Sequence, residues 1–187
     1  TAVGKAAMEL TTTGGENTAI GYSALYANTS GTNNVAMGRS ALVANTTASN
    51  NVAAGKSALA ANTTGANNVV IGESAGLAAT TSTGNVVIGQ EAVKTGAFTG
   101  FNNVVIGKLA GEDLTSADAN VIIGEDAGKN QTTADNNVLI GQGAAEANLT
   151  GANNVAIGNL ALAANTTASD NVSVGQTSLM ANTTGTG

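Results

Sequence analysis

Residues 154–158, Asn154-Val155-Ala156-Ile157-Gly158, form a phrase that returns, with small changes, along the whole chain. Its closing glycine recurs every seventeen residues, with one step of eighteen between Gly89 and Gly107. The eleven glycines are Gly4, Gly21, Gly38, Gly55, Gly72, Gly89, Gly107, Gly124, Gly141, Gly158 and Gly175. A fixed short period predicts a solenoid, in which each unit buries its apolar face against its neighbours. We therefore expect one all-β, parallel β-solenoid domain over residues 1–187.

Both ends of the sequence lie inside a repeat. Residues 1–4 and 184–187 lack the polar, atypical unit that caps a free solenoid end. We therefore expect the chain to be a fragment of a longer fibre.

The recurring phrase predicts one short strand in each coil. Side chains alternate across a strand, so Val155 and Ile157 share one face and Ala156 lies on the other. Both faces are apolar in nearly every coil, as in a strand covered on both sides. One face is expected to pack inside the coil and the other to meet a partner chain. The candidate residues for that seam are Val70, Val87, Val105, Ile122 and Leu139.

The remainder of each coil is less certain in type. Alanine stands three residues after the glycine in ten of eleven coils, often followed by leucine, as in Ala58-Leu59. Periodicity leaves a second short strand and a helical turn open, and we favour the strand. The segment 62–67, Asn-Thr-Thr-Gly-Ala-Asn, is rich in turn formers and is expected to be the outward loop.

An asparagine lies four residues before each of the last ten glycines. Identical amides stacked along an axis can donate and accept hydrogen bonds in a ladder. We interpret this column as structural rather than as a binding site. Its members are Asn17, Asn34, Asn51, Asn68, Asn85, Asn103, Asn120, Asn137, Asn154 and Asn171.

Asparagine and threonine also suggest two alternative functions. Eight Asn-x-Ser/Thr sequons occur, which we attribute to turn chemistry rather than to glycosylation. Pairs such as Thr46-Thr47 suggest an ice-binding array, but adjacent residues of a strand point to opposite faces, so ice binding is the lesser option.

The single break in register includes both phenylalanines of the chain, Phe98 and Phe101. On an exposed loop they would be surface contacts that stack on sugars or anchor a partner. The favoured alternative is that a ring folds back and fills a locally widened core.

Composition excludes several classes of function. The net charge of −6, with six Lys and Arg, provides no basic surface for nucleic acid. The chain has no His or Cys, so we expect no enzyme and no catalytic residue. Acidic residues gather between Glu112 and Asp135, but neither the EF-hand spacing nor the calcium-binding nonapeptide is present, so we expect no metal site and no cofactor. No apolar run is long enough to insert in a membrane. Lys56 with Glu73, and Lys108 with Glu125, are expected ion pairs between coils.

The phrases at 34–38 (Asn-Val-Ala-Met-Gly), 68–72 (Asn-Val-Val-Ile-Gly) and 154–158 resemble the head repeat of YadA-type trimeric autotransporter adhesins. The sequence at 17–31 also resembles repeats of phage tail-fibre-like proteins. The resemblance covers the whole chain, although the adhesin heads have a coil shorter than seventeen residues. It implies a left-handed parallel β-roll that assembles as a homotrimer.

These observations predict a non-enzymatic, structural or adhesive segment of an extracellular trimeric fibre, the head or stalk of a bacterial surface adhesin. The alternative is the shaft or receptor-binding segment of a phage tail fibre. The expected location is the cell surface or the virion, and the expected partners are two further copies of the chain and a host-surface glycan or matrix protein.

Overall fold

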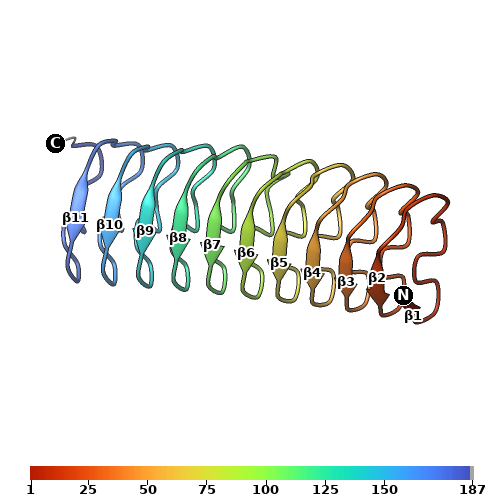
Figure 1. The fold of residues 1–187 in the computed structure, drawn as a ribbon. Helices are drawn as coiled ribbons and strands as arrows, with labels where there is room; N and C mark the ends of the chain where they lie inside the picture. Colours follow the sequence, from red (N-terminus) through yellow and green to blue (C-terminus); the bar gives the residue numbers. More distant parts are fainter. Residues whose placement is uncertain (186–187) are drawn as a thin grey trace.

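The computed structural model describes residues 1–185 and shows a parallel β-solenoid. Eleven short strands lie side by side along one wall of a rod, with the two chain ends at opposite ends of it (Figure 1). The strands are β1 (Ala2–Val3), β2 (Thr18–Ile20), β3 (Val35–Met37), β4 (Val52–Ala54), β5 (Val69–Ile71), β6 (Val86–Ile88), β7 (Val104–Ile106), β8 (Val121–Ile123), β9 (Val138–Ile140), β10 (Val155–Ile157) and β11 (Val172–Val174). They form one sheet in sequence order. The predicted β-solenoid is confirmed.

Successive coils stack in register, so that each residue lies over its equivalent in the next coil. Val69 pairs with Val86, Val70 with Val87 and Ile71 with Ile88, all in parallel. The pairing keeps this register across the eighteen-residue coil, where Val86 pairs with Val104. Strands in a sheet are about 4.8 Å apart, so the eleven coils make a rod roughly 50 Å long.

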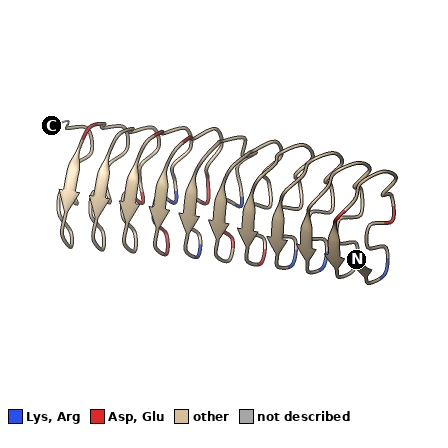
Figure 2. Ribbon diagram, viewed as in Figure 1, with Lys and Arg blue, Asp and Glu red and all other residues tan. Residues whose placement is uncertain are grey.

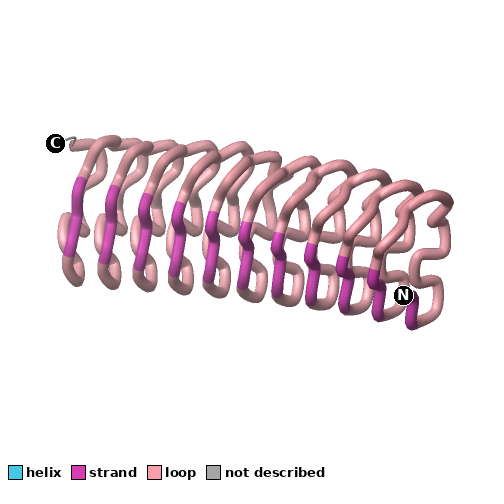
Figure 3. Tube along the Cα trace, viewed as in Figure 1, coloured by secondary structure: helices cyan, strands magenta, loops and turns pink. Residues whose placement is uncertain are grey.

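The Ala-Leu segment after each glycine is a turn, and the second strand predicted there is absent from residues 1–185 (Figure 3). In the coil that begins at Gly55, the φ angles of Gly55, Ser57 and Leu59 are 141°, 57° and 51°. Positive φ at alternate residues curls the backbone, whereas an extended strand needs negative φ throughout. The turn is still tied to its neighbours, because Ser57 N–H donates to Arg39 O at 2.8 Å and Leu59 N–H donates to Ala75 O at 2.9 Å.

The core is a narrow column of small and medium side chains inside the coils. The alanine three residues after each glycine is fully buried from Ala24 to Ala161. The residue after this alanine and the middle residue of the following strand vary in size in opposite directions, so that one is large where the other is small. Leu42 is followed by a strand with Ala53 in the middle, whereas Gly128 is followed by a strand with Leu139 in the middle. A Cβ on Gly128 would lie 2.9 Å from Leu139 Cδ1 and 3.3 Å from Ile122 Cδ1, so the large strand residue occupies the space that a leucine fills elsewhere.

This exchange of volume predicts a compensating double variant. Gly128→Leu alone is expected to destabilise the rod by about 1–3 kcal/mol through overpacking, and Leu139→Ala alone by about 2–5 kcal/mol through a cavity. Together they recreate the Leu42 and Ala53 arrangement, so the double variant is expected to lose less stability than the sum of the two. Urea unfolding of the four proteins measures the coupling energy, and strict additivity would contradict this account.

Candidate functional site

The asparagine column forms a continuous buried ladder. Asn68 Nδ2 donates to Asn51 Oδ1 at 3.0 Å and to Ser82 O at 2.8 Å. Its own Oδ1 accepts the backbone N–H of Asn85 at 3.0 Å. The six candidate structural residues are all 0–1% exposed, and the backbone N–H of each donates to Oδ1 of the preceding Asn of the column. They are Asn34, Asn51, Asn68, Asn103, Asn137 and Asn154. The structure therefore places them between coils, out of reach of a ligand.

A second amide ladder, which the sequence interpretation missed, runs through the first residue of the predicted outward loop. Asn62 is fully buried, and its Nδ2 donates to Asn45 Oδ1 at 3.0 Å and to Gly65 O at 3.0 Å. The members of this ladder are Asn28, Asn45, Asn62, Gln131, Asn148 and Asn165. The signal was present in the sequence, since these residues recur at one place in the repeat.

Burial of the second ladder also limits the sequons. Asn28, Asn45, Asn62, Asn148 and Asn165 are 0% exposed and Asn171 is 3% exposed. An asparagine whose amide lies inside the coil cannot accept a glycan in the folded protein. Among the eight sequons, only those at Asn130 and Asn182 are partly exposed.

The break in register interrupts the second ladder with apolar side chains. Ala79, Phe98 and Leu114 belong to the buried core between Asn62 and Gln131. Phe98 is 1% exposed, so the favoured prediction of a core-filling ring is confirmed for it, and its place among the candidate surface contacts is wrong. The reason is volume: three coils without a ladder amide leave a widened space, and the largest apolar side chain fills it.

Phe101 differs from Phe98, because its side chain is on the surface and 45% exposed. Its backbone is fixed on both sides. Phe101 forms a parallel bridge with Thr83 of the preceding coil, and its N–H donates to Asp118 Oδ1 of the next coil at 2.7 Å. Phe101 therefore remains a candidate surface contact, and hydrogen bonds to both neighbouring coils hold its backbone in place.

The predicted seam residues lie inside the chain. Val70, Val87, Val105, Ile122 and Leu139 are 0–2% exposed and belong to the core of a single chain. The prediction that they meet a partner is wrong, because the coil interior accepts only one residue of each strand, and its size is matched to the turn opposite. The unpartnered face is the reverse one.

The reverse face, here called the outer apolar face, consists of the first and third residue of each three-residue strand, β2 to β11. Its centre is Val69, Ile71, Val86, Ile88, Val104 and Ile106, and each is exposed or half-buried. Ile71 is 40% exposed in the middle of the rod. None of the eleven strands contains a charged residue, and Figure 2 shows the acidic and basic residues on the turns instead. Two parallel apolar rows therefore follow the rod from β3 to β11.

The threonine pairs divide between structure and solvent. Thr46 is half-buried and its hydroxyl donates to Thr63 O at 3.1 Å, whereas Thr47 is exposed. The same bond recurs at Thr29, Thr63, Thr115 and Thr132. One threonine of each pair is therefore bound to the next coil, which leaves a single exposed row rather than the paired array that the ice-binding option requires.

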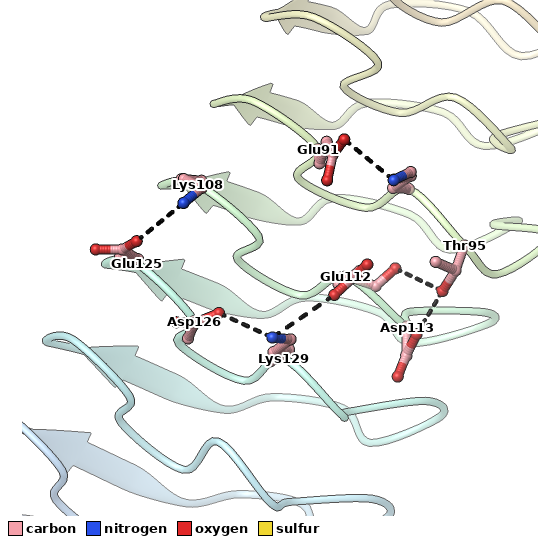
Figure 4. A network of polar contacts seen from close by, with 9 residues as sticks. Glu91, Thr95, Lys108, Glu112, Asp113, Glu125, Asp126 and Lys129 are labelled. Atoms are coloured by element: carbon pink, nitrogen blue, oxygen red, sulfur yellow. Dashed lines mark hydrogen bonds and ion pairs between the residues drawn. The ribbon is translucent and has the colours of Figure 1, made fainter.

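Ion pairs connect the turns of neighbouring coils (Figure 4). The predicted pairs are present, with Lys56 Nζ 2.9 Å from Glu73 Oε1 and Lys108 Nζ 3.4 Å from Glu125 Oε1. Both are exposed, so each contributes under about 1 kcal/mol.

Lys129 lies between two carboxylates, 3.2 Å from Asp126 Oδ1 and 3.9 Å from Glu112 Oε2. The hydrogen bond to Asp126 raises the pKa of Lys129 above its usual 10.5. A lysine whose pKa is raised by folding stabilises the folded state at every pH below its unfolded pKa. That contribution is lost as the pH rises through the raised pKa of the folded state. Lys129 is therefore charged at neutral pH, and its contact with Glu112 connects two neighbouring coils.

Residues 1–185 contain no pocket and no group of three acidic, His or Cys residues placed to hold a metal ion. They also contain no helix that meets the length and hydropathy of a membrane span. The surfaces available for interaction are thus the outer apolar face, the exposed turns and Phe101.

Comparison with protein-family models, with curated proteins and with solved structures finds no match to this chain.

Proposed function

We propose that this chain is a non-enzymatic segment of an extracellular, homotrimeric fibre that mediates attachment, as the head or stalk of a bacterial surface adhesin does. The observation that carries the proposal is the outer apolar face. From β5 to β10 every first residue is Val and every third residue is Ile. These two exposed or half-buried rows would cost solvation free energy if left in water, and contiguous apolar patches of this kind mark interaction sites. Sister chains with the same period can cover the rows coil by coil.

The number of chains and the hand of the coil come from the resemblance to the adhesin head repeat. It supports a left-handed roll and three copies around one axis. The mechanical role follows from the bonding pattern. Backbone hydrogen bonds join every coil to its neighbours and two amide ladders run through the interior, so the rod is stiff enough to hold a binding tip away from its base.

The shaft of a phage or phage-like tail fibre is the second candidate. The resemblance of residues 17–31 to tail-fibre repeats favours it, and the same outer apolar face would serve it. The location would then be the virion rather than a cell surface.

Sedimentation of the purified chain tests the proposal. We expect the wild-type chain to sediment as a trimer at micromolar concentration. Ile71→Lys with Val86→Lys on the outer apolar face is expected to give folded monomers, because each interface would bury unpaired charges. Thr64→Lys, which adds charge to an exposed turn, is the matched control and should remain trimeric. A wild-type chain that is monomeric at these concentrations contradicts the proposal.

A further inference from the structure

The side chain of Phe101 is not part of the buried core, although its backbone bonds to both neighbouring coils. In the other coils its place is taken by small or polar residues, including Thr32, Ser49 and Asp135. The core-filling ring of this coil is Phe98, which leaves the ring of Phe101 on the surface. Tyr22 is the other strongly exposed ring, and the guanidinium of Arg39 lies 5.9 Å from its centroid. Of these two strongly exposed rings, Phe101 is the one whose face is not covered by an arginine.

The backbone on which this ring stands is held rigidly. Phe101 N–H donates to Asp118 Oδ1, and Phe101 O accepts from Ala119 N–H at 3.0 Å and from Asn103 Nδ2 at 3.1 Å. Asn102 N–H donates to Thr83 O at 3.2 Å. A ligand would therefore meet a preorganised surface and would not have to order a loop.

Polar residues that can bind hydroxyls adjoin Phe101, one in the chain and others in the next coils. Asp118 uses Oδ1 for Phe101, so its second carboxylate oxygen is left as an acceptor, and the amide of the exposed Asn102 supplies both a donor and an acceptor. Asp135 follows in the same row, its Oδ1 accepting Asp118 N–H at 2.7 Å. None of the ion pairs in residues 1–185 involves Asp118 or Asp135. The local charge is therefore negative and disfavours an anionic ligand.

We propose that Phe101, Asn102 and Asp118 form a binding site for an uncharged saccharide. A sugar ring has an apolar face of C–H groups that packs on an aromatic ring and a rim of hydroxyls that bind carboxylate and amide groups. The two carboxylates exclude sialylated and sulfated sugars. The site gives the attachment role proposed above a chemical class of receptor, and it rests on that role.

Saturation-transfer NMR on the full chain tests the site. The probes are methyl α-mannoside, methyl β-galactoside and N-acetylglucosamine, with N-acetylneuraminic acid as the acidic comparison. We expect binding of at least one uncharged probe and none of the acidic sugar. Phe101→Ala should weaken the affinity about tenfold or more, as loss of an aromatic anchor commonly does, while Phe101→Tyr retains binding. Tyr22→Ala, which removes the other exposed ring, should bind as the wild type does.

Three outcomes would overturn the site: no uncharged probe binds, Phe101→Ala binds as well as the wild type, or the acidic sugar binds equally. Sedimentation of the same samples separates this failure from that of the proposed function. A trimer that does not bind the sugars refutes the saccharide site alone, whereas a monomer refutes the fibre.

Discussion

Gly72→Ala is expected to destabilise the rod by about 4 kcal/mol or more, although it adds a single methyl group. Gly72 has a φ of 137°, a conformation that costs other residues about 1–3 kcal/mol. In addition, a Cβ at this position would lie 2.5 Å from Gly89 O in the next coil. Since backbone contacts backbone there, no side chain can move aside, and the coils must separate locally. Urea unfolding followed by circular dichroism measures the loss.

Gly175→Ala is the matched control for this prediction. Gly175 has a similar φ of 121°, but the nearest atom to its added Cβ would be Ser178 Cβ at 4.0 Å. The control therefore carries the conformational cost without the contact between coils. Equal destabilisation by the two variants would show that close stacking is not what the recurring glycine provides.

Asn68→Leu is expected to cost about 2–6 kcal/mol. The substitution leaves Ser82 O and Asn85 N–H without the partners that Asn68 supplies inside the coil. Each buried backbone group that loses its hydrogen bond costs about 1–3 kcal/mol. Thr64→Ala is the control, because it removes an exposed side chain four residues before Asn68. It should change the free energy of unfolding by less than about 0.5 kcal/mol. Thermal unfolding of both variants decides the question, and a stable Asn68→Leu would refute a structural role for the ladder.

The sequence was sufficient for the fold and for the first ladder, because both depend on recurrence at a fixed interval. It was insufficient to decide which strand face lies inside. The two faces of the strand are both apolar, so hydropathy cannot distinguish the inner face from the outer one. The prediction that Val70 and Val87 meet a partner chain was based on hydropathy alone. Size held the missing information: Ala53 stands opposite Leu42, whereas Leu139 stands opposite Gly128. Two positions need to compensate for each other's size in this way only when their side chains fill the same enclosed space.

The turn after the glycine was assigned wrongly for a different reason. Ala58-Leu59 is apolar and buried, which is compatible with a strand, and the positive φ of Ser57 and Leu59 has no signature in those residue types. Hydrogen bonds to both neighbouring coils hold that conformation, so the stack, rather than local preference, determines it. The fully buried Phe98 and the exposed Phe101 likewise differ through the widened interior and not through their own chemistry.

Register between coils has a consequence for how this molecule can change in length. Removal of residues 38–54 would join Met37 to Gly55, a junction of the same kind as Met37 to Gly38, and would leave the neighbours of every remaining column chemically similar. In-frame duplication or deletion of one repeat within the gene would therefore lengthen or shorten the rod by one coil, about 4.8 Å. Recombination between repeats can thus change the length of the rod without changing its fold.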